Sequence, residues 1–214
     1  ENDADAYLGR GTGYANLGLN ETAIEDLSKA IGIGPLRVPT LLTTKSALAG
    51  AYNMRGLAYG FHGLGQNEKA IPDFDTAITY DPMYAAAYHN RGRNYSVINR
   101  DEEAIDDYDQ AIRLGSEDSY IFGARGASYS KLKKYPEAIE DYTKALGLAP
   151  PDEFRGMILG KRGNAYASVQ DYQKAVDDIT SAIKHQPYNG FLYYLRQWVC
   201  YRWRNPPTHY SNWN

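Results

Sequence analysis

Small and apolar residues recur along this chain at the spacing of a helix. Between Ala85 and Ile98 they return every three or four positions, and the same period resumes from Glu102 to Leu114. The polar run Asn99-Arg100-Asp101 separates the two segments. This period is typical of amphipathic helices, and a polar interruption between two of them indicates a turn. The pattern therefore predicts a helical hairpin within residues 85–118.

The same skeleton occurs five times. Each copy carries Arg-Gly-x-x-Tyr in its first helix and Ala-Ile-x-Asp or Ala-Val-x-Asp at the start of its second, with another alanine seven residues after the first. The first alanine of the pair stands at Ala23, Ala70, Ala104, Ala138 and Ala175, so the underlying period is 34 residues. A single hairpin of this size cannot bury its apolar face, so the copies are expected to stack on one another.

This skeleton resembles the tetratricopeptide repeat, which carries an aromatic, Leu-Gly and Tyr in its first helix and Ala, an aromatic, Ala and Pro in its second. The resemblance implies an all-α fold, a right-handed α-solenoid of helix-turn-helix repeats that binds other proteins. The expected organisation is five repeats within residues 1–189, followed by a terminal helix. The repeats span residues 4–37, 49–84, 85–118, 119–152 and 156–189, with an insertion at 38–48 and three extra residues before the fifth repeat.

One feature departs from the family pattern, because arginine replaces the leucine before the glycine in every copy. Each copy also has an aspartate three residues after its first alanine, and an unpartnered arginine would be costly to bury. We therefore expect five structural ion pairs between the helices: Arg10 with Asp26, Arg55 with Asp73, Arg91 with Asp107, Arg125 with Asp141 and Arg162 with Asp178. The alternative is an arginine stripe that binds phosphate or an acidic polymer, which the matched aspartates disfavour by neutralising it.

The opposite face of each first helix lines a concave groove in this family, and most residues at these positions are small, such as Gly123 and Gly160. The polar candidates for contact with a partner are Asn53, His89, Asn90, Arg93, Lys161 and Asn164. They do not reproduce the set of Lys, Arg and Asn residues with which some tetratricopeptide domains clamp a C-terminal carboxylate. His89 and Arg93, one turn apart, are either a local anion site or a solvated pair.

The repeat pattern breaks off after Pro187. Residues 190–204 are expected to form a capping or junction helix, and 205–214 a tail, because Gln197 replaces the glycine of the skeleton. This helix is apolar on both faces, and its groove side carries four aromatic residues, Phe191, Tyr194, Trp198 and Tyr201. Either the tail covers them with Tyr210 and Trp213, or they form an interface with another chain.

Composition excludes several classes of function. The net charge of -3 gives no reason to expect nucleic acid as a partner, and the single cysteine excludes an intramolecular disulfide or a thiolate-rich metal site. The four histidines have no partner at ligand or triad spacing, and no apolar run approaches the roughly 20 residues that span a bilayer. We therefore expect no catalytic residue, cofactor, metal or membrane insertion.

The compartment stays open. The chain starts without Met and shows no signal-peptide pattern, as expected of a mature form or a fragment. Two glycosylation sequons begin at Asn20 and Asn94, and a chance occurrence is favoured because Asn94 falls inside an expected helix.

Two hypotheses for function follow. In the first, the chain is a non-enzymatic scaffold that holds a peptide or helix of a partner protein in its groove. In the second, it is a structural protein that associates with itself through the aromatic C-terminal helix, as a dimer or as a filament.

Overall fold

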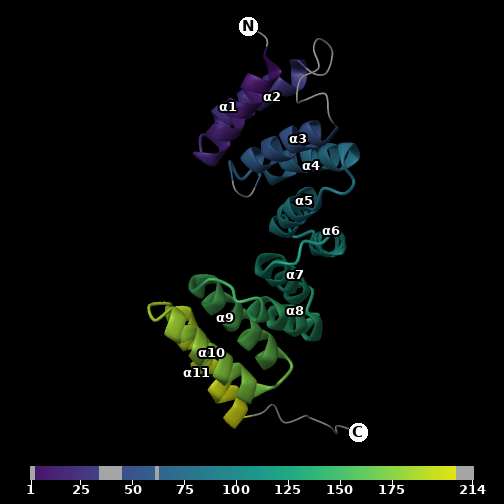
Figure 1. Ribbon diagram of the computed structural model, residues 1–214. Helices are drawn as coiled ribbons and strands as arrows, with labels where there is room; N and C mark the ends of the chain where they lie inside the picture. The colour runs from purple at the N-terminus through teal and green to yellow at the C-terminus, as the bar shows by residue number, and fades with distance from the viewer. Residues whose placement is uncertain (1–2, 34–44, 61–62, 206–214) are drawn as a thin grey trace, which may run out of the picture. The chain divides into compact units, whose positions relative to one another are not determined.

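The computed structural model of the chain describes residues 3–33, 45–60 and 63–205, and every regular element within these ranges is an α-helix (Figure 1). The helices fall into two compact units, unit 1 (Glu1–Ser116) and unit 2 (Glu117–Asn214). An all-α fold was predicted from the helical period, and the structure confirms it.

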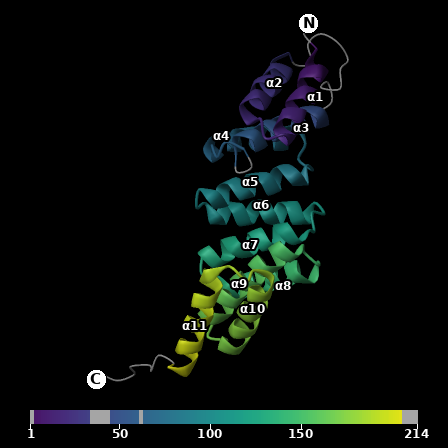
Figure 2. The same ribbon diagram turned by 90° about the vertical axis from the view of Figure 1, so that its left-hand side faces the viewer.

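Unit 1 consists of three helical hairpins, which Figure 2 shows from a second side. The hairpins are α1 with α2, α3 with α4 and α5 with α6, and α2 and α4 each also pack on the first helix of the next hairpin. The helices span α1 (Ala4–Asn16), α2 (Asn20–Ile33), α3 (Lys45–Tyr59), α4 (Asn67–Tyr80), α5 (Ala85–Val97) and α6 (Asp101–Arg113).

Unit 2 consists of two hairpins and one further helix. α7 pairs with α8 and α9 with α10, α8 packs on α9, and α11 packs on α10. α9 also touches both α7 and α11, so these three helices are neighbours in unit 2. The helices span α7 (Ser119–Lys131), α8 (Tyr135–Gly147), α9 (Asp152–Ser168), α10 (Tyr172–His185) and α11 (Gly190–Arg204).

The turn inside each hairpin follows one local rule. The second residue after the first helix takes a left-handed conformation, with φ of 60° at Asn99, 59° at Lys133 and 65° at Gln170. In these three turns the next residue donates its N–H to the carbonyl of the skeleton tyrosine, as Arg100 does to Tyr95 at 2.9 Å. This is a Schellman-type cap, which reverses the chain within about three residues and fixes where the second helix begins.

Small residues set the distance between paired helices. All ten alanines of the skeleton are 0% exposed: Ala23, Ala30, Ala70, Ala77, Ala104, Ala111, Ala138, Ala145, Ala175 and Ala182. The skeleton glycines lie even closer to the facing helix. A Cβ atom placed on Gly92 would lie 3.0 Å from Tyr108, and one on Gly163 would lie 2.7 Å from Ile179. Each hairpin is therefore packed to a spacing that tolerates no side chain at this position.

The connection before the fifth hairpin differs from the expected one. We expected three extra residues before a fifth repeat that begins at 156, but α9 already begins at Asp152. Pro151 precedes the helix and two carboxylates, Asp152 and Glu153, lie in its first turn, where they favour a helix N-terminus. The extra residues therefore lengthen α9, which brings Phe154 onto a helix.

α11 packs on its neighbours with a different face from the one expected. Tyr193 and Cys200 stand at the positions of the skeleton's two aromatic residues and would therefore be expected on the packing side, whereas Leu192, Leu195 and Val199 are the buried residues. Tyr193 is exposed, and Arg196 lies over its ring at 5.7 Å, as the arginines of the repeats lie over their tyrosines. Gln197, which stands at the glycine position of the skeleton, is also exposed.

Candidate functional site

The five arginine–aspartate pairs are in contact, each joining the two helices of one hairpin. Both nitrogens on one edge of the guanidinium bind both carboxylate oxygens, for example Arg91 with Asp107 at 2.8 and 2.6 Å and Arg125 with Asp141 at 2.8 and 2.6 Å. Arg55 with Asp73, Arg162 with Asp178 and Arg10 with Asp26 have the same two-point geometry. Such forks are the strongest form of ion pair.

The arginines also connect successive hairpins. The remaining guanidinium nitrogen of Arg55 donates to Ser28 at 3.1 Å, that of Arg91 to Asp75 at 2.6 Å and that of Arg162 to Thr143 at 3.0 Å. All three acceptors lie on the second helix of the preceding hairpin. Arg91 is in addition flanked by the rings of Tyr88 and Tyr95. These arginines are thus bound by side chains of the protein itself. The matching aspartates explain why the arginines are present, and no bound phosphate or acidic polymer is needed to explain them.

The first pair differs in its surroundings. The side chain of Arg10 is 55% exposed, compared with 21% or less in the other four pairs. Its guanidinium, bound to the Asp26 carboxylate, holds the pKa of that aspartate below its usual range. The ion pair at the N-terminal hairpin is therefore intact even though one of its members faces solvent.

Two of the polar candidates in unit 1, Asn53 and Asn90, form hydrogen bonds with other residues of the unit. The Asn53 side chain is buried, donates to the Tyr84 hydroxyl at 3.3 Å and accepts from the Asn90 amide at 3.0 Å. His89 is half-buried with its ring edge-on to Tyr108, and Arg93 is also half-buried. The buried position of Asn53 makes it a packing residue between two hairpins, out of reach of a partner.

Asn94 is buried as well. Its side chain is 2% exposed, donates to the Asn90 carbonyl at 2.7 Å and lies against Gly60 of the preceding hairpin. A glycan attached to this amide would have no space in the folded unit. In this structure the Asn94 side chain therefore serves in packing between two hairpins. The other sequon asparagine, Asn20, is half-exposed at the start of α2.

Unit 1 retains a shallow pocket beside Asn90. It is lined by Ala15 and Asn16 of α1, Met54 and Leu57 of α3, and Asn90 of α5, among others. Among the described residues that line it, none has a charged side chain. Of the unit 1 candidates from the sequence, Asn90 is the one that lines it.

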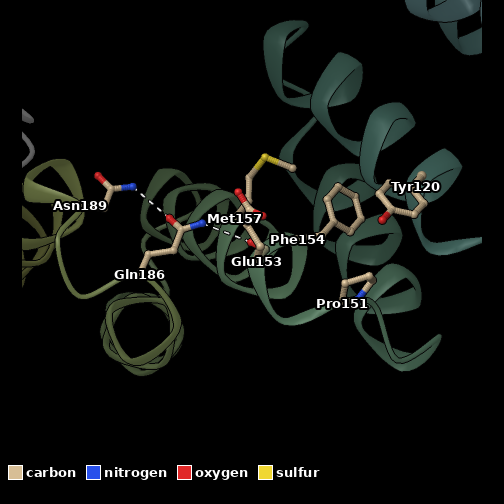
Figure 3. Close-up of a pocket in the computed structure, with 7 residues that line it drawn as sticks. All are labelled: Tyr120, Pro151, Glu153, Phe154, Met157, Gln186 and Asn189. Carbon is tan, nitrogen blue, oxygen red and sulfur yellow. Dashed lines mark hydrogen bonds between the residues drawn. The ribbon is translucent and has the colours of Figure 1, made fainter. Parts of the chain in front are cut away.

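Unit 2 contains a larger hollow, where α7, α9 and the α10–α11 connection meet. We call its first part the aromatic slot. The slot has a volume of about 500 Å³ and is lined by Tyr120, Pro151, Glu153, Phe154, Met157, Gln186 and Asn189. Figure 3 shows the Tyr120 and Phe154 rings beside each other, and their centroids are 4.4 Å apart. The slot thus has an aromatic wall, with Met157 beside it.

Glycines bring the walls of the hollow together. A Cβ atom on Gly123 of α7 would lie 2.8 Å from Phe154, and one on Gly156 of α9 would lie 2.8 Å from His185. A Cβ on Gly160 would lie 2.9 Å from Leu192 of α11. Gly123 and Gly160 were expected to line a groove. Both are points at which neighbouring helices touch, and Gly160 also lines the second part of the hollow.

The second part of the hollow, which we call the lysine pocket, adjoins the slot and shares Met157, Gln186 and Asn189 with it. Its further lining includes Lys161 and Asn164 of α9 and Phe191 of α11. The structure thus brings together two sets of candidates that the sequence had kept apart, the polar residues of the fifth repeat and the aromatic residues of the terminal helix. α11 is a wall of this hollow.

The aromatic residues predicted for the groove side of α11 are exposed. Phe191, Tyr194, Trp198 and Tyr201 are each 40 to 65% exposed. Their spacing of three or four residues places them on one side of the helix. Phe191 lines the lysine pocket, and Tyr194, Trp198 and Tyr201 follow it along the same side of α11. The tail residues Tyr210 and Trp213, which were considered as a cover for this side, lie outside the described residues.

Several lining residues were missed by sequence reasoning, among them Phe154, Gln186 and Asn189. Phe154 lies in the part of α9 that precedes residue 156, the expected start of the fifth repeat, and Gln186 and Asn189 lie at the connection between α10 and α11. The acidic first turn of α9 was a usable signal for Phe154, because it marks a helix start. The repeat pattern gave no signal for the side-chain amides of Gln186 and Asn189.

Comparison with known families decides the classification. Models of the tetratricopeptide repeat match residues 55–119 and 119–152. The chain belongs to the tetratricopeptide repeat family. Members of this family are in general non-enzymatic scaffolds for protein–protein interaction, and the two helices per repeat seen here are those of the family fold.

Solved structures of tetratricopeptide proteins share this fold. A crystal structure of MamA is 20% identical, with a TM-score of 0.70 over 87% of this chain and 93% of that one. A tetratricopeptide protein from Parabacteroides merdae is 18% identical, with a TM-score of 0.70 over 92% of this chain and 72% of that one. YrrB, described as having an unusual peptide-binding site, is 21% identical, with a TM-score of 0.65 over 74% of this chain and 79% of that one. No curated protein matches this tetratricopeptide chain.

Within the described ranges, no group of three or more His, Cys, Asp or Glu residues is arranged to hold a metal ion. No helix in the described part of this tetratricopeptide chain combines the length and the apolar character that crossing a membrane requires.

Proposed function

We propose that this chain is a non-enzymatic scaffold that binds a segment of a partner protein, with the hollow of unit 2 as its contact site. The observation that carries the proposal is the hollow itself. It is a continuous depression with an aromatic wall, a flexible methionine and a rim of side-chain amides. Mainly apolar surfaces with a few fixed polar groups are typical of sites that bind ligands.

The amides suit a peptide backbone. Gln186 donates to the Glu153 carbonyl at 3.2 Å and accepts from Asn189 at 3.0 Å, as the dashed lines in Figure 3 show. Each amide group has further donor or acceptor capacity beyond these two bonds. The hydrogen bonds hold the amides in place, so they can pair with a peptide backbone at a small cost in side-chain entropy.

The proposal is tested by selecting peptides from a displayed random library on the wild-type protein. We expect enriched peptides to bind Met157→Glu at least about tenfold more weakly, because a carboxylate in the slot opposes burial of an apolar side chain. Val169→Glu is the matched control, since Val169 is exposed at the end of α9 away from the lining residues. Both variants are checked for folding by circular dichroism. Enriched peptides that bind wild type and Met157→Glu equally would contradict the proposed site.

The second candidate function is self-association through α11, favoured by the exposed aromatic side described above. An exposed stripe of this kind is typical of an interface. Light scattering across a dilution series should then show a mass that rises with concentration, and Trp198→Ser should shift the rise to about tenfold higher concentration. Leu17→Ser, which changes an exposed apolar residue of unit 1, is the control. A mass that stays monomeric at every concentration would remove this alternative.

A further inference from the structure

Arg196 of α11 stands at the skeleton position that an arginine fills in each of the five hairpins. In the hairpins this arginine binds an aspartate on the second helix, as Arg162 binds Asp178 at 2.7 and 2.9 Å. No second helix follows α11 among the described residues, and Arg196 has no carboxylate within ion-pair distance in that part of the chain. The counter-charge that each hairpin supplies internally is therefore missing at α11.

Two further arginines of α11 are in the same situation. Arg202 and Arg204 have no ion-pair partner within the described ranges, and the sequence from Gly190 to Arg204 contains no aspartate or glutamate. Arg202 lies over the ring of Trp198 at 5.6 Å, so its charge is held beside an exposed aromatic residue. The three positive charges are thus not neutralised within the helix, and they attract an anionic partner.

The positive excess of unit 2 lies entirely in α11. Unit 2 contains thirteen arginine and lysine residues and ten aspartate and glutamate residues, so its basic residues exceed the acidic ones by three, the number of arginines in α11. Unit 1 contains ten basic and sixteen acidic residues. An anionic surface therefore attracts α11 and repels unit 1, which favours α11 as the point of contact.

The exposed side of α11 is aromatic and not aliphatic. Tyr194, Trp198 and Tyr201 are exposed, and Arg204 follows three residues later on the same side, whereas the leucines and the valine of the helix are buried. Tyrosine and tryptophan gather at membrane–water interfaces because each combines an apolar ring with a polar group. Basic side chains beside exposed rings are typical of helices that lie on anionic membranes.

We propose that α11 binds the surface of a membrane that contains anionic lipid, with its arginines at the lipid phosphates and its exposed rings at the boundary of the acyl chains. Arginine suits phosphate oxygens because its planar guanidinium donates two parallel hydrogen bonds. A second copy of the chain, docked symmetrically on the same side, would instead bring arginines against arginines. The inference goes beyond the proposed function, because it uses the outer side of α11 and not the lining of the hollow.

Sedimentation with lipid vesicles tests the inference. One set of vesicles is pure phosphatidylcholine, and the other mixes phosphatidylglycerol with phosphatidylcholine in a ratio of one to two. We expect wild type to bind the anionic vesicles at least about tenfold more tightly than the neutral ones, and salt to weaken the binding by screening the charges. All three tryptophans of the chain lie at or after Trp198, so a blue shift of their emission should accompany binding.

Variants separate the charges from the rings. Arg202→Gln combined with Arg204→Gln should weaken binding to the anionic vesicles at least about tenfold. Lys133→Gln combined with Lys134→Gln removes two exposed lysines from the α7–α8 turn and should leave the binding unchanged. Tyr201→Ser should weaken binding to the anionic vesicles as well, because an exposed ring is lost from the contact. Circular dichroism checks that each variant is folded.

Several results would overturn the inference. If wild type binds neutral and anionic vesicles equally, or if the lysine variant loses as much binding as the arginine variant, the arginines of α11 do not make the contact. If wild type binds neither kind of vesicle, α11 is not a membrane-binding helix. A mass that rises with concentration in the absence of lipid, together with no vesicle binding, would mean that a second copy of the chain covers the aromatic side.

Discussion

Replacing Gly163 with leucine is expected to destabilise unit 2 by about 3 kcal/mol, because the position has no space for a side chain. Even a single Cβ atom would lie 2.7 Å from Ile179 and 3.1 Å from the carbonyl oxygen of Ala175. The carbonyl belongs to the backbone of α10 and cannot rotate away, so the two helices of the hairpin must separate. Chemical denaturation followed by circular dichroism measures the loss.

Gly147 is the control for this prediction. It is also helical, but a Cβ atom placed there meets nothing within 4 Å. Gly147→Leu should leave the free energy of unfolding unchanged or raise it by about 0.5 kcal/mol, because glycine is a poor helix former. Equal destabilisation by both substitutions would mean that the close approach of α10 to Gly163 is not the cause of the loss.

Arg91→Met is expected to destabilise unit 1 by about 3 to 5 kcal/mol. The arginine binds Asp107 through two nitrogens and Asp75 through the third, and its removal leaves the buried Asp107 carboxylate without a counter-charge. Arg100→Met breaks an ion pair whose two side chains are each nearly half-exposed, and should cost less than about 1 kcal/mol. Thermal and chemical unfolding of the two variants make the comparison.

A double variant tests whether the pair itself is the cause. Arg91→Met combined with Asp107→Leu removes both buried charges, and should recover part of the stability lost in the single variant. If the double variant is less stable than Arg91→Met by the full cost of a second substitution, the aspartate has a role apart from its arginine. Peptide binding by the hollow of unit 2 should be unchanged in all of these variants once the proteins are compared below their unfolding transitions.

The interior of each hairpin was predictable from the sequence because its determinants lie close together in the chain. Ala104, Ala111 and Gly92 are small since they face a helix a few residues away, and Arg91 needs an acidic partner on that same helix. Five copies of one pattern made these constraints visible without any structure. The position of the turns followed in the same way, because the left-handed residue stands eight positions after the arginine in Asn99, Lys133 and Gln170.

The site was less predictable, because it depends on contacts between hairpins. Periodicity placed Gly123 and Gly160 on the groove side, but it could not show that Phe154 would lie close against the first and Leu192 against the second. The same limit applies to Asn53, which appeared available to a partner until its bonds to Tyr84 and Asn90 were known. Gln186 and Asn189 lie between helices, where no repeating pattern constrains side-chain direction.

Gln197 has a consequence for how an array of this kind can be lengthened. In the five hairpins, a Cβ atom at the equivalent glycine would come within about 3 Å of the second helix, and Gln197 has a full side chain there. A second helix therefore cannot pack against α11 at the spacing used in the rest of the chain. A protein engineer who wished to add repeats would insert them between α10 and α11, and would keep α11 as the final helix.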